Sequence, residues 1–250
     1  MTSLDEVIAA QGQKVAALKA HKKGLMQQLF PREGETLPRL RFPEFRDKAE
    51  WEGKTLGELG DTLPGLSGKS GDDFGIGQPF VTYKQVFDAP IIDRSKCGRV
   101  KVSEGERQTR LRYGDVLFTT SSETPGEVGW ASILLDPSDE PLYLNSFCFA
   151  LRIKDPKLFN PEFARHIFHS SGYRASVGVL AQGSTRFNIS RSAFVEIALL
   201  IPGDVREQEA IAACLSTLDA QFAAETEKLA ALKTHKRGLM QQMFPSPEGD

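Results

Sequence analysis

The chain has 250 residues and a formal net charge of −2, so it can hold one large or two small domains and carries no overall charge that would attract nucleic acid. Its three cysteines (Cys97, Cys148 and Cys214) lie in unrelated contexts, which excludes a spaced metal motif and a disulfide framework and indicates a reducing cytoplasm. The sequence has no signal peptide and no run of about 18 apolar residues, so we expect neither export by a recognisable signal nor a membrane span.

The first predicted element is a helix whose sequence occurs twice. Residues 4–31 (LDEVIAAQGQKVAALKAHKKGLMQQLFP) and residues 218–245 (LDAQFAAETEKLAALKTHKRGLMQQMFP) are identical at 18 of 28 positions, at a constant offset of 214. Both copies finish in a proline that follows a phenylalanine, which is a signal for the end of a helix. The repeat therefore predicts a globular middle that lies between two copies of one helix.

The apolar residues of both copies recur at alternating intervals of four and three. This period predicts a coiled-coil seam, and the alternative is two amphipathic helices packed on a common core. In the first copy the seam comprises Leu4, Ile8, Val15, Leu18, Leu25 and Leu29, with polar gaps at Gln11 and Lys22. In the second copy it comprises Ile211, Leu215, Leu218, Phe222, Leu229, Leu232, Leu239 and Met243, with gaps at Glu225 and Lys236.

The polar gaps predict how the two copies pair. An antiparallel pair that overlaps end to end places Lys22 opposite Glu225, and it places Gln11 opposite Lys236. A parallel pair in register would place Lys22 against Lys236, and these two positive charges repel each other. Polar residues in a seam are known to fix the orientation of paired helices through such contacts. We therefore expect an antiparallel pair. Its pairing residues are Leu18, Lys22, Leu25, Leu29, Leu218, Phe222, Glu225, Leu229, Leu232 and Lys236.

The middle of the chain alternates short β-prone runs with turn signals. The runs are PFVTYKQVF, RVKVS, TRLRY, DVLFTT, GWASILL, LYLNSFCFALRI and FVEIALLIP. One helix interrupts them, from about Pro161 to Ser170 with an extension to Val177, and we expect residues 159–172 to pack on one face of the sheet. The predicted fold class is α+β, a mixed-sheet domain flanked by two long helices that form an antiparallel coiled coil.

This interpretation divides the chain into five segments. They are an N-terminal spacer helix (1–31), an extended connector with Pro38 and Pro43 (32–50), a globular domain (51–203), a C-terminal spacer helix (204–245) and a tail (246–250).

Two glycine-rich segments suggest nucleotide chemistry, but each departs from its motif. Gly68-Lys69-Ser70 matches the end of a phosphate-binding loop, yet Leu63 stands where the leading glycine belongs. Phe74 to Gly77 is similar to the glycine turn of an S-adenosylmethionine site, yet no methyltransferase motif of the Asn-Pro-Pro-Tyr kind accompanies it. His166 and His169 have no companion ligand, so we expect packing or surface histidines rather than a metal pair.

Polar loop residues offer donors and acceptors of the kind that contact DNA. Arg186 and Lys69 suit phosphates or guanine, whereas Gln182 and Asn188 suit the edges of adenine. The candidate DNA contacts are Lys69, Tyr83, Lys84, Thr120, Ser121, Ser122, Gln182, Ser184, Thr185, Arg186 and Asn188. The alternative is that these are turn-forming side chains that bond their own backbone.

A basic run follows the first strands of the middle domain. It comprises Arg99, Lys101, Arg107, Arg110 and Arg112, interleaved with Glu104 and Glu106. The sequence leaves two interpretations open, a solvated hairpin and an edge that faces phosphates.

Several motifs of the chain occur together in one order and spacing. They are the ALKxHKxGLMQQxFP helix ends (17–31 and 231–245), REGETLPRLRFPEF (32–45) leading to WEGKTLGEL, Gly114 to Leu117, GSTRFNIS (183–190) and IPGDVREQEAIAACLSTLD (201–219). In this combination the chain resembles the specificity (S) subunit of type I restriction–modification systems. The usual member of that family is about twice as long and has two recognition domains, so the chain is similar to a half-length form.

The resemblance implies a target recognition domain that reads one half of a bipartite DNA sequence. It also implies helices that act as a spacer and dock DNA methyltransferase (M) subunits, which link to the restriction (R) subunit. The chain itself would be no enzyme and would hold no metal or cofactor, with S-adenosylmethionine, ATP and Mg on partner subunits only. A homodimer partner or another half-subunit would supply the second recognition domain.

Two further function classes stay open. One is a dimerising fragment that regulates or inhibits the complex without reading DNA. The other is an enzyme that binds a nucleotide in a glycine-rich loop, where Lys69 would be the critical residue.

Overall fold

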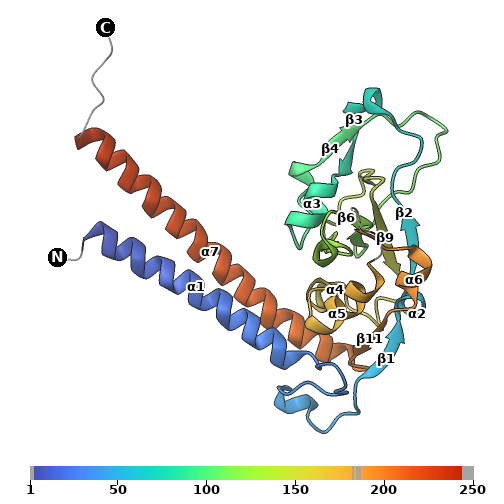
Figure 1. The fold of residues 1–250 in the computed structure, drawn as a ribbon, viewed down its shortest axis with the longest axis horizontal. Helices are drawn as coiled ribbons and strands as arrows, with labels where there is room; N and C mark the ends of the chain where they lie inside the picture. Colours follow the sequence, from blue (N-terminus) through green and yellow to red (C-terminus); the bar gives the residue numbers. More distant parts are fainter. Residues whose placement is uncertain (1–2, 182, 184–186, 244–250) are drawn as a thin grey trace. The chain divides into compact units, whose positions relative to one another are not determined.

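The computed structural model describes residues 3–181, 183 and 187–243, and within them the chain divides into two compact units (Figure 1). The first unit consists of two helices, α1 (Leu4–Leu29) up to Gln28 and α7 (Val205–Met243) from Ala213. The second unit runs from Leu29 to Ala212 and holds every strand found among the described residues. Among the described residues, no helix has both the length and the apolar character that a bilayer crossing requires.

The second unit is a mixed α/β domain, and the predicted fold class is confirmed. Its helices are α2 (Leu56–Leu59), α3 (Tyr83–Asp88), α4 (Pro161–Ile167), α5 (Ser171–Leu180) and α6 (Arg191–Val195), with short 3-10 turns at Pro43–Phe45, Gly71–Asp73, Arg94–Lys96 and Pro125–Glu127. Its strands are β1 (Glu52–Thr55), β2 (Gly60–Pro64), β3 (Phe74–Val81), β4 (Gly98–Val100), β5 (Val116–Thr119), β6 (Ser121–Ser122), β7 (Ala131–Ile133), β8 (Tyr143–Leu144), β9 (Cys148–Ile153), β10 (Phe187–Asn188) and β11 (Ala198–Ile201).

The strands form four small sheets. The largest is antiparallel with the order β2-β9-β5-β7, and β4-β3-β8 is mixed because β3 and β8 run parallel. Two antiparallel pairs, β1–β11 and β6–β10, complete the set. In the pair β1–β11, the first and last strands of the domain hydrogen-bond to each other, so the chain enters and leaves the domain at one place.

The central strand β5 separates two cores because successive side chains of a strand point to opposite faces. On one face Phe118 stacks on Phe149 of β9 and meets Phe168 and Phe194 with ring centroids 5.0 and 4.7 Å apart. On the other face Leu117 belongs to an aliphatic cluster with buried residues of β3, α3 and β8. The expectation that the segment 159–172 packs on one face of the sheet is therefore met through Phe168.

Some predicted strands are wrong, and local capping explains two of them. Residues 83–87 form helix α3 because the Thr82 hydroxyl accepts a hydrogen bond from the Gln85 backbone N–H at 3.3 Å, as an N-cap does. Residues 191–195 form α6 in the same way, capped by Ser190. TRLRY forms no strand, and LYLNSFCFALRI is two strands separated by a turn at Asn145.

A buried carboxylate ties the start of α7 to the connector. The Glu207 side chain is 2 % exposed and accepts two hydrogen bonds of 2.7 Å from Arg41 and one of 3.2 Å from the indole of Trp51. Arg41 also donates to the backbone oxygens of Lys48 and Ala49. The connector was expected to be merely extended, but these bonds fold it against the domain.

The next residue of α7 is equally buried. The Gln208 amide accepts from the backbone N–H of Asn160 at 2.8 Å and donates to the oxygens of Leu158 and Pro202, each at 2.9 Å. Asn160 in turn caps α4. The pair Glu207-Gln208 therefore holds the connector and the start of α4 together through bonds that satisfy buried polar groups.

The first unit shows the heptad seam that the sequence predicts. In α1 the positions Leu4, Ile8, Gln11, Val15, Leu18, Lys22, Leu25 and Leu29 are less exposed than most of their neighbours. In α7 the same holds for Leu218, Phe222, Glu225, Leu229, Leu232 and Lys236, whereas Leu239 is exposed. The two helices run antiparallel within one chain (Figure 1). Lys22 accordingly meets Asp219 near one end of the pair, and Asp5 meets Lys236 near the other.

The predicted register of this pair is wrong, by six residues at one polar contact and by eleven at the other. Lys22 was expected opposite Glu225 but pairs with Asp219, six residues earlier. Gln11 was expected opposite Lys236 but donates to the carboxylate and the backbone oxygen of Glu225, at 2.7 and 2.9 Å. A shift of seven residues keeps an apolar seam intact, so the polar contacts decide between registers. In the structure the seam lysines meet aspartates that stand beside the seam.

We expect Glu207→Ala to lower the free energy of unfolding by about 3–5 kcal/mol, because removal of one partner leaves the buried Arg41 charge uncompensated. Glu35→Ala is the matched control, since its i,i+4 pair with Arg39 is exposed and should contribute far less to the free energy of unfolding. Urea unfolding of the full chain measures both. Equal effects of the two substitutions would contradict this account.

The register can be tested by charge exchange. Lys22→Glu should destabilise the helix pair by about 0.5–1 kcal/mol, since it places two negative charges together. Adding Asp219→Lys should restore the thermal midpoint followed by far-ultraviolet circular dichroism. Adding Glu225→Lys should not, and rescue by that change would support the register first expected from the sequence.

Candidate nucleic-acid interface

The structure brings together six of the candidate DNA contacts. Strand β6 pairs with β10, so that Ser121 lies opposite Asn188 and Ser122 opposite Phe187. The Tyr83 hydroxyl donates to the backbone oxygen of Ser121 at 2.6 Å. Thr120 lies next to this strand pair, and its backbone oxygen accepts a hydrogen bond from the backbone N–H of Ile189 at 3.0 Å. We call these residues with Lys84 the β6–β10 cluster (Tyr83, Lys84, Thr120, Ser121, Ser122 and Asn188).

The cluster borders a small pocket of about 230 Å³. Its lining residues are Tyr83, Phe87, Ser121, Ser122, Glu123 and Glu127. The Ser122 hydroxyl donates to Glu127 at 2.7 Å and accepts from the Thr124 backbone, and the bond from Ser122 lowers the pKa of Glu127. Ser122 thus supports its own turn, as the alternative interpretation held. A charged glutamate here disfavours phosphate and suits a donor such as the amino group of cytosine.

Only part of the cluster reaches solvent. Lys84 and Asn188 are exposed and Tyr83 is half-buried, whereas Ser121 and Ser122 are buried. The residues positioned for outward contacts are therefore Lys84 and Asn188. Gln182, Ser184, Thr185 and Arg186 lie outside the described residues.

Lys69 belongs to a different local structure. Its ammonium group lies 2.7 Å from Glu106, and its side chain is only 8 % exposed. The hydrogen bond from Lys69, followed by that from Gln108, lowers the pKa of Glu106 to about 2. Lys69 is thus neutralised and covered in this structure, and it presents no open charge to a phosphate.

The basic run lies on β4 and in the segment that leads to β5, and all five of its side chains are exposed. Among the ion pairs between described residues, none involves Arg99, Lys101, Arg107, Arg110 or Arg112. Arg152 fixes the end of the segment, because it donates to Asp115 at 2.7 Å and to the backbone oxygen of Arg110 at 2.8 Å. The run is therefore an exposed positive segment on a held backbone, which suits phosphate contacts.

One exposed aromatic residue was missed by sequence reasoning. Phe147 is 56 % exposed, and its backbone oxygen accepts from Thr120 at 3.0 Å, next to the β6–β10 cluster. The sequence pattern predicts one long strand, LYLNSFCFALRI, that includes Phe147, whereas in the structure Phe147 lies between β8 and β9. The Asn145-Ser146 pair is the turn signal that could have separated it.

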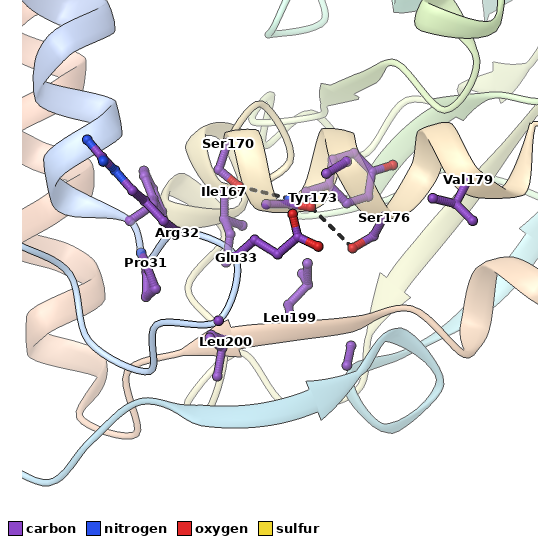
Figure 2. Close-up of a pocket in the computed structure, with 15 residues that line it drawn as sticks. Pro31, Arg32, Glu33, Ile167, Ser170, Tyr173, Ser176, Val179, Leu199 and Leu200 are labelled. Atoms are coloured by element: carbon purple, nitrogen blue, oxygen red, sulfur yellow. Dashed lines mark hydrogen bonds between the residues drawn. The ribbon is translucent and has the colours of Figure 1, made fainter.

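A larger pocket of about 550 Å³ lies between the connector, helices α4 and α5, and β11. Figure 2 shows Glu33 from the connector beside Tyr173 and Ser176 of α5 and Leu199 of β11, whereas the side chain of Arg32 points away from them. None of the candidate DNA contacts that the structure describes lines this pocket. Within the described residues, no group of three or more His, Cys, Asp or Glu side chains is arranged to hold a metal ion.

The sequence matches the family described as Type I restriction modification DNA specificity domain over residues 48–234, well over half of the chain. The chain belongs to this family. The resemblance drawn from its motifs is confirmed, and a family of DNA-specificity domains agrees with the prediction that the chain is not an enzyme. Comparison with curated proteins gives no match.

Several solved structures are similar to this chain in fold. The HsdS subunit from Thermoanaerobacter tengcongensis matches with a TM-score of 0.61 and 19% identity, over 96% of this chain and 54% of that one. A structure that concerns complex assembly and conformational transition of the type I R-M system matches with a TM-score of 0.65 and 20% identity, over 96% of this chain and 54% of that one. The type I restriction–modification S subunit from M. genitalium matches with a TM-score of 0.54 and 19% identity, over 82% of this chain and 46% of that one. The chain thus spans about half the length of the chains that it matches.

Two substitutions should separate base contacts from phosphate contacts. Asn188→Ala should cost about 1–3 kcal/mol on a preferred DNA sequence and little elsewhere, because an amide reads base edges. Arg107→Ala should weaken binding to all sequences and reduce the salt slope by about 0.9, because a phosphate contact releases counterions.

Binding of the full chain to a pool of randomised duplexes at several salt concentrations measures both effects. Arg206→Ala is the control, since this exposed arginine is already paired with Asp204 at 2.7 Å. Unchanged binding by both test variants would remove these two surfaces from the interface.

Proposed function

We propose that the chain is the DNA-reading specificity subunit of a type I restriction–modification enzyme, with one recognition domain that reads half of a bipartite target. The family match over residues 48–234 carries this proposal. Within the domain, the proposal is supported by the exposed side chains of Asn188 and Lys84 in the β6–β10 cluster and by the exposed basic run. A chain with a net charge of −2 needs such local surfaces to bind DNA.

The two repeat helices serve in this proposal as a coiled-coil spacer and as the dock for methyltransferase subunits, which link to the restriction subunit. A 28-residue repeat is about 42 Å long, equivalent to about twelve base pairs of DNA. The helices expose the apolar side chains of Val7, Leu239 and Met240. Exposed apolar residues on a charged helix pair fit a protein partner better than they fit DNA.

A second recognition domain completes the proposed target. A second copy of the chain in a homodimer, or another half-subunit, would supply it. Half-site spacing mirrors protein symmetry, so two identical domains would read a palindromic, interrupted sequence. S-adenosylmethionine, ATP and Mg belong in this proposal to the partner subunits, and the assembly works on DNA in the cytoplasm.

The alternative is a dimerising fragment that regulates or inhibits the complex without reading DNA. The helix pair supports it, because Lys14 and Lys22 of α1 form ion pairs with Glu225 and Asp219 of α7 within one chain. The two proposals differ in what DNA the complex prefers.

We expect a defined methylation motif in cells that express this chain with its cognate methyltransferase subunit. Genome-wide mapping of methylated adenines should give a palindromic bipartite sequence if two copies act as a symmetric pair. An asymmetric sequence would mean that a different recognition domain completes the target. Stable co-purification of the subunits without any motif would overturn the DNA-reading proposal in favour of the regulatory fragment.

A further inference from the structure

Strand β3 contains a bulge that displays one apolar side chain. Val100 of β4 lies opposite both Phe74 and Gln78 of β3, so the three residues between them leave the ladder (Figure 1). These residues are Gly75-Ile76-Gly77, which we call the Ile76 bulge, and the Ile76 side chain is 65 % exposed. Bulges re-aim a side chain and are frequent beside functional sites.

Both glycines of the Ile76 bulge are required by its backbone. Gly75 has a φ of 100° and Gly77 a φ of 94°, in the region that favours glycine. A Cβ on Gly77 would also lie 2.6 Å from the backbone oxygen of Val100. The sequence pattern of residues 74–77 is similar to an S-adenosylmethionine turn, but in the structure these residues belong to one strand. The two glycines therefore serve to project Ile76.

The backbone on both sides of the bulge is held in place. Val100 is fully buried in a small core that includes Phe80, and the ring of Phe74 packs on Phe80 with centroids 5.2 Å apart. The backbone oxygen of Asp73 accepts a hydrogen bond from the backbone N–H of Lys101 at 2.7 Å. The bulge is thus preorganised, so little conformational entropy is lost when a partner covers it.

A basic residue stands at each end of the bulge. The Nη1 atom of Arg99 lies 3.3 Å from the backbone oxygen of Gly77, to which it donates, and Lys101 is bound through its backbone to Asp73. Because Val100 between them points into the core, Arg99 and Lys101 point to the opposite face, and both are exposed. An apolar tip thus lies between two cationic side chains.

This combination fits the minor groove of DNA. The surroundings attract an anionic partner, since the five exposed cations of the basic run stand against one exposed carboxylate, Glu104, while Glu106 is paired with Lys69. Proteins that kink DNA insert an apolar side chain between base steps from the minor groove while cations hold the phosphates. That groove is about 6 Å wide, so it admits one side chain carried between two glycines but no helix.

We propose that Ile76 is an apolar wedge that enters the minor groove of the target DNA and reads the deformability of one base step. Arg99 and Lys101 hold the phosphates beside it. Pyrimidine–purine steps unstack most easily, so the wedge favours them at its position without a hydrogen bond to any base. The inference rests on the proposed DNA-reading function and adds to it a specificity determinant outside the β6–β10 cluster.

The test selects binders of the full chain from randomised duplexes. The parent chain should enrich pyrimidine–purine steps about tenfold at one position of its selected sequence. Ile76→Ala should reduce this enrichment to about twofold or less and leave the bases preferred at other positions unchanged, because only the wedge is shortened. Ile76→Leu, which keeps an apolar side chain of equal size, should retain the enrichment. Leu158→Ala is the matched control, since Leu158 is an apolar residue that is 62 % exposed between β9 and α4.

A second measurement follows the shape of the DNA. Fluorescence resonance energy transfer between dyes at the two ends of a selected duplex should rise when the parent chain binds, because a kink brings the ends together. With saturating Ile76→Ala the transfer should stay close to that of the free duplex. Replacement of thymine by uracil at the favoured step removes a major-groove methyl group but keeps the flexible step, so it should leave the preference intact.

Three results would overturn the inference while the parent chain still selects a sequence. They are an unchanged step preference with Ile76→Ala, an equal loss with Leu158→Ala, and loss of the preference on uracil substitution, which would mean a contact with a thymine methyl group instead. Circular dichroism of each variant verifies that the domain remains folded. A parent chain that selects no sequence at all would contradict the DNA-reading function itself, and this inference with it.

Discussion

The buried charge of Glu207 is the constraint on which the arrangement of the domain depends. A carboxylate that is 2 % exposed is costly unless its oxygens are paired, and here Arg41 and the Trp51 indole supply the partners. Arg41 can do so only if the connector folds back, and Gln208 fixes the N-cap residue Asn160 of α4 in the same way. Entry and exit of the domain are thereby coupled, and the pairing of β1 with β11 closes the same region.

A domain held in this way can display polar side chains on short, fixed strands. The β6–β10 pair and the turn that Ser122 and Glu127 stabilise are such a platform. Its two serines are buried, whereas Asn188 and Lys84 are exposed. Recognition on this surface would rest on a few exposed side chains and on the exposed arginines, with the hydroxyl residues acting as their support.

The sequence predicts the features that local periodicity determines. The heptad pattern identified both helices, their seam and their antiparallel orientation, but a shift by one heptad leaves that pattern unchanged, so the register had to come from Asp219 and Asp5 beside the seam. The helix at residues 83–88 was missed because one cap at Thr82 outweighs a β-prone run. Lys69 looked available because its partner Glu106 is distant in sequence, and no local pattern shows such an ion pair.

The repeat explains why these contacts bear on partner choice. Two surfaces built from the same residues are complementary to each other and also to themselves, so identical contact positions cannot distinguish a helix of the same chain from a helix of another. Asp5 and Asp219 are the same residue at equivalent positions, and so are Lys22 and Lys236. The ion pairs that they form therefore do not distinguish a helix of the same chain from a helix of another. Discrimination has to come from a contact position at which the copies differ. Position 11 differs from 225, contacts it directly and joins an amide to a carboxylate, so the difference between the copies lies within the seam that the two helices share.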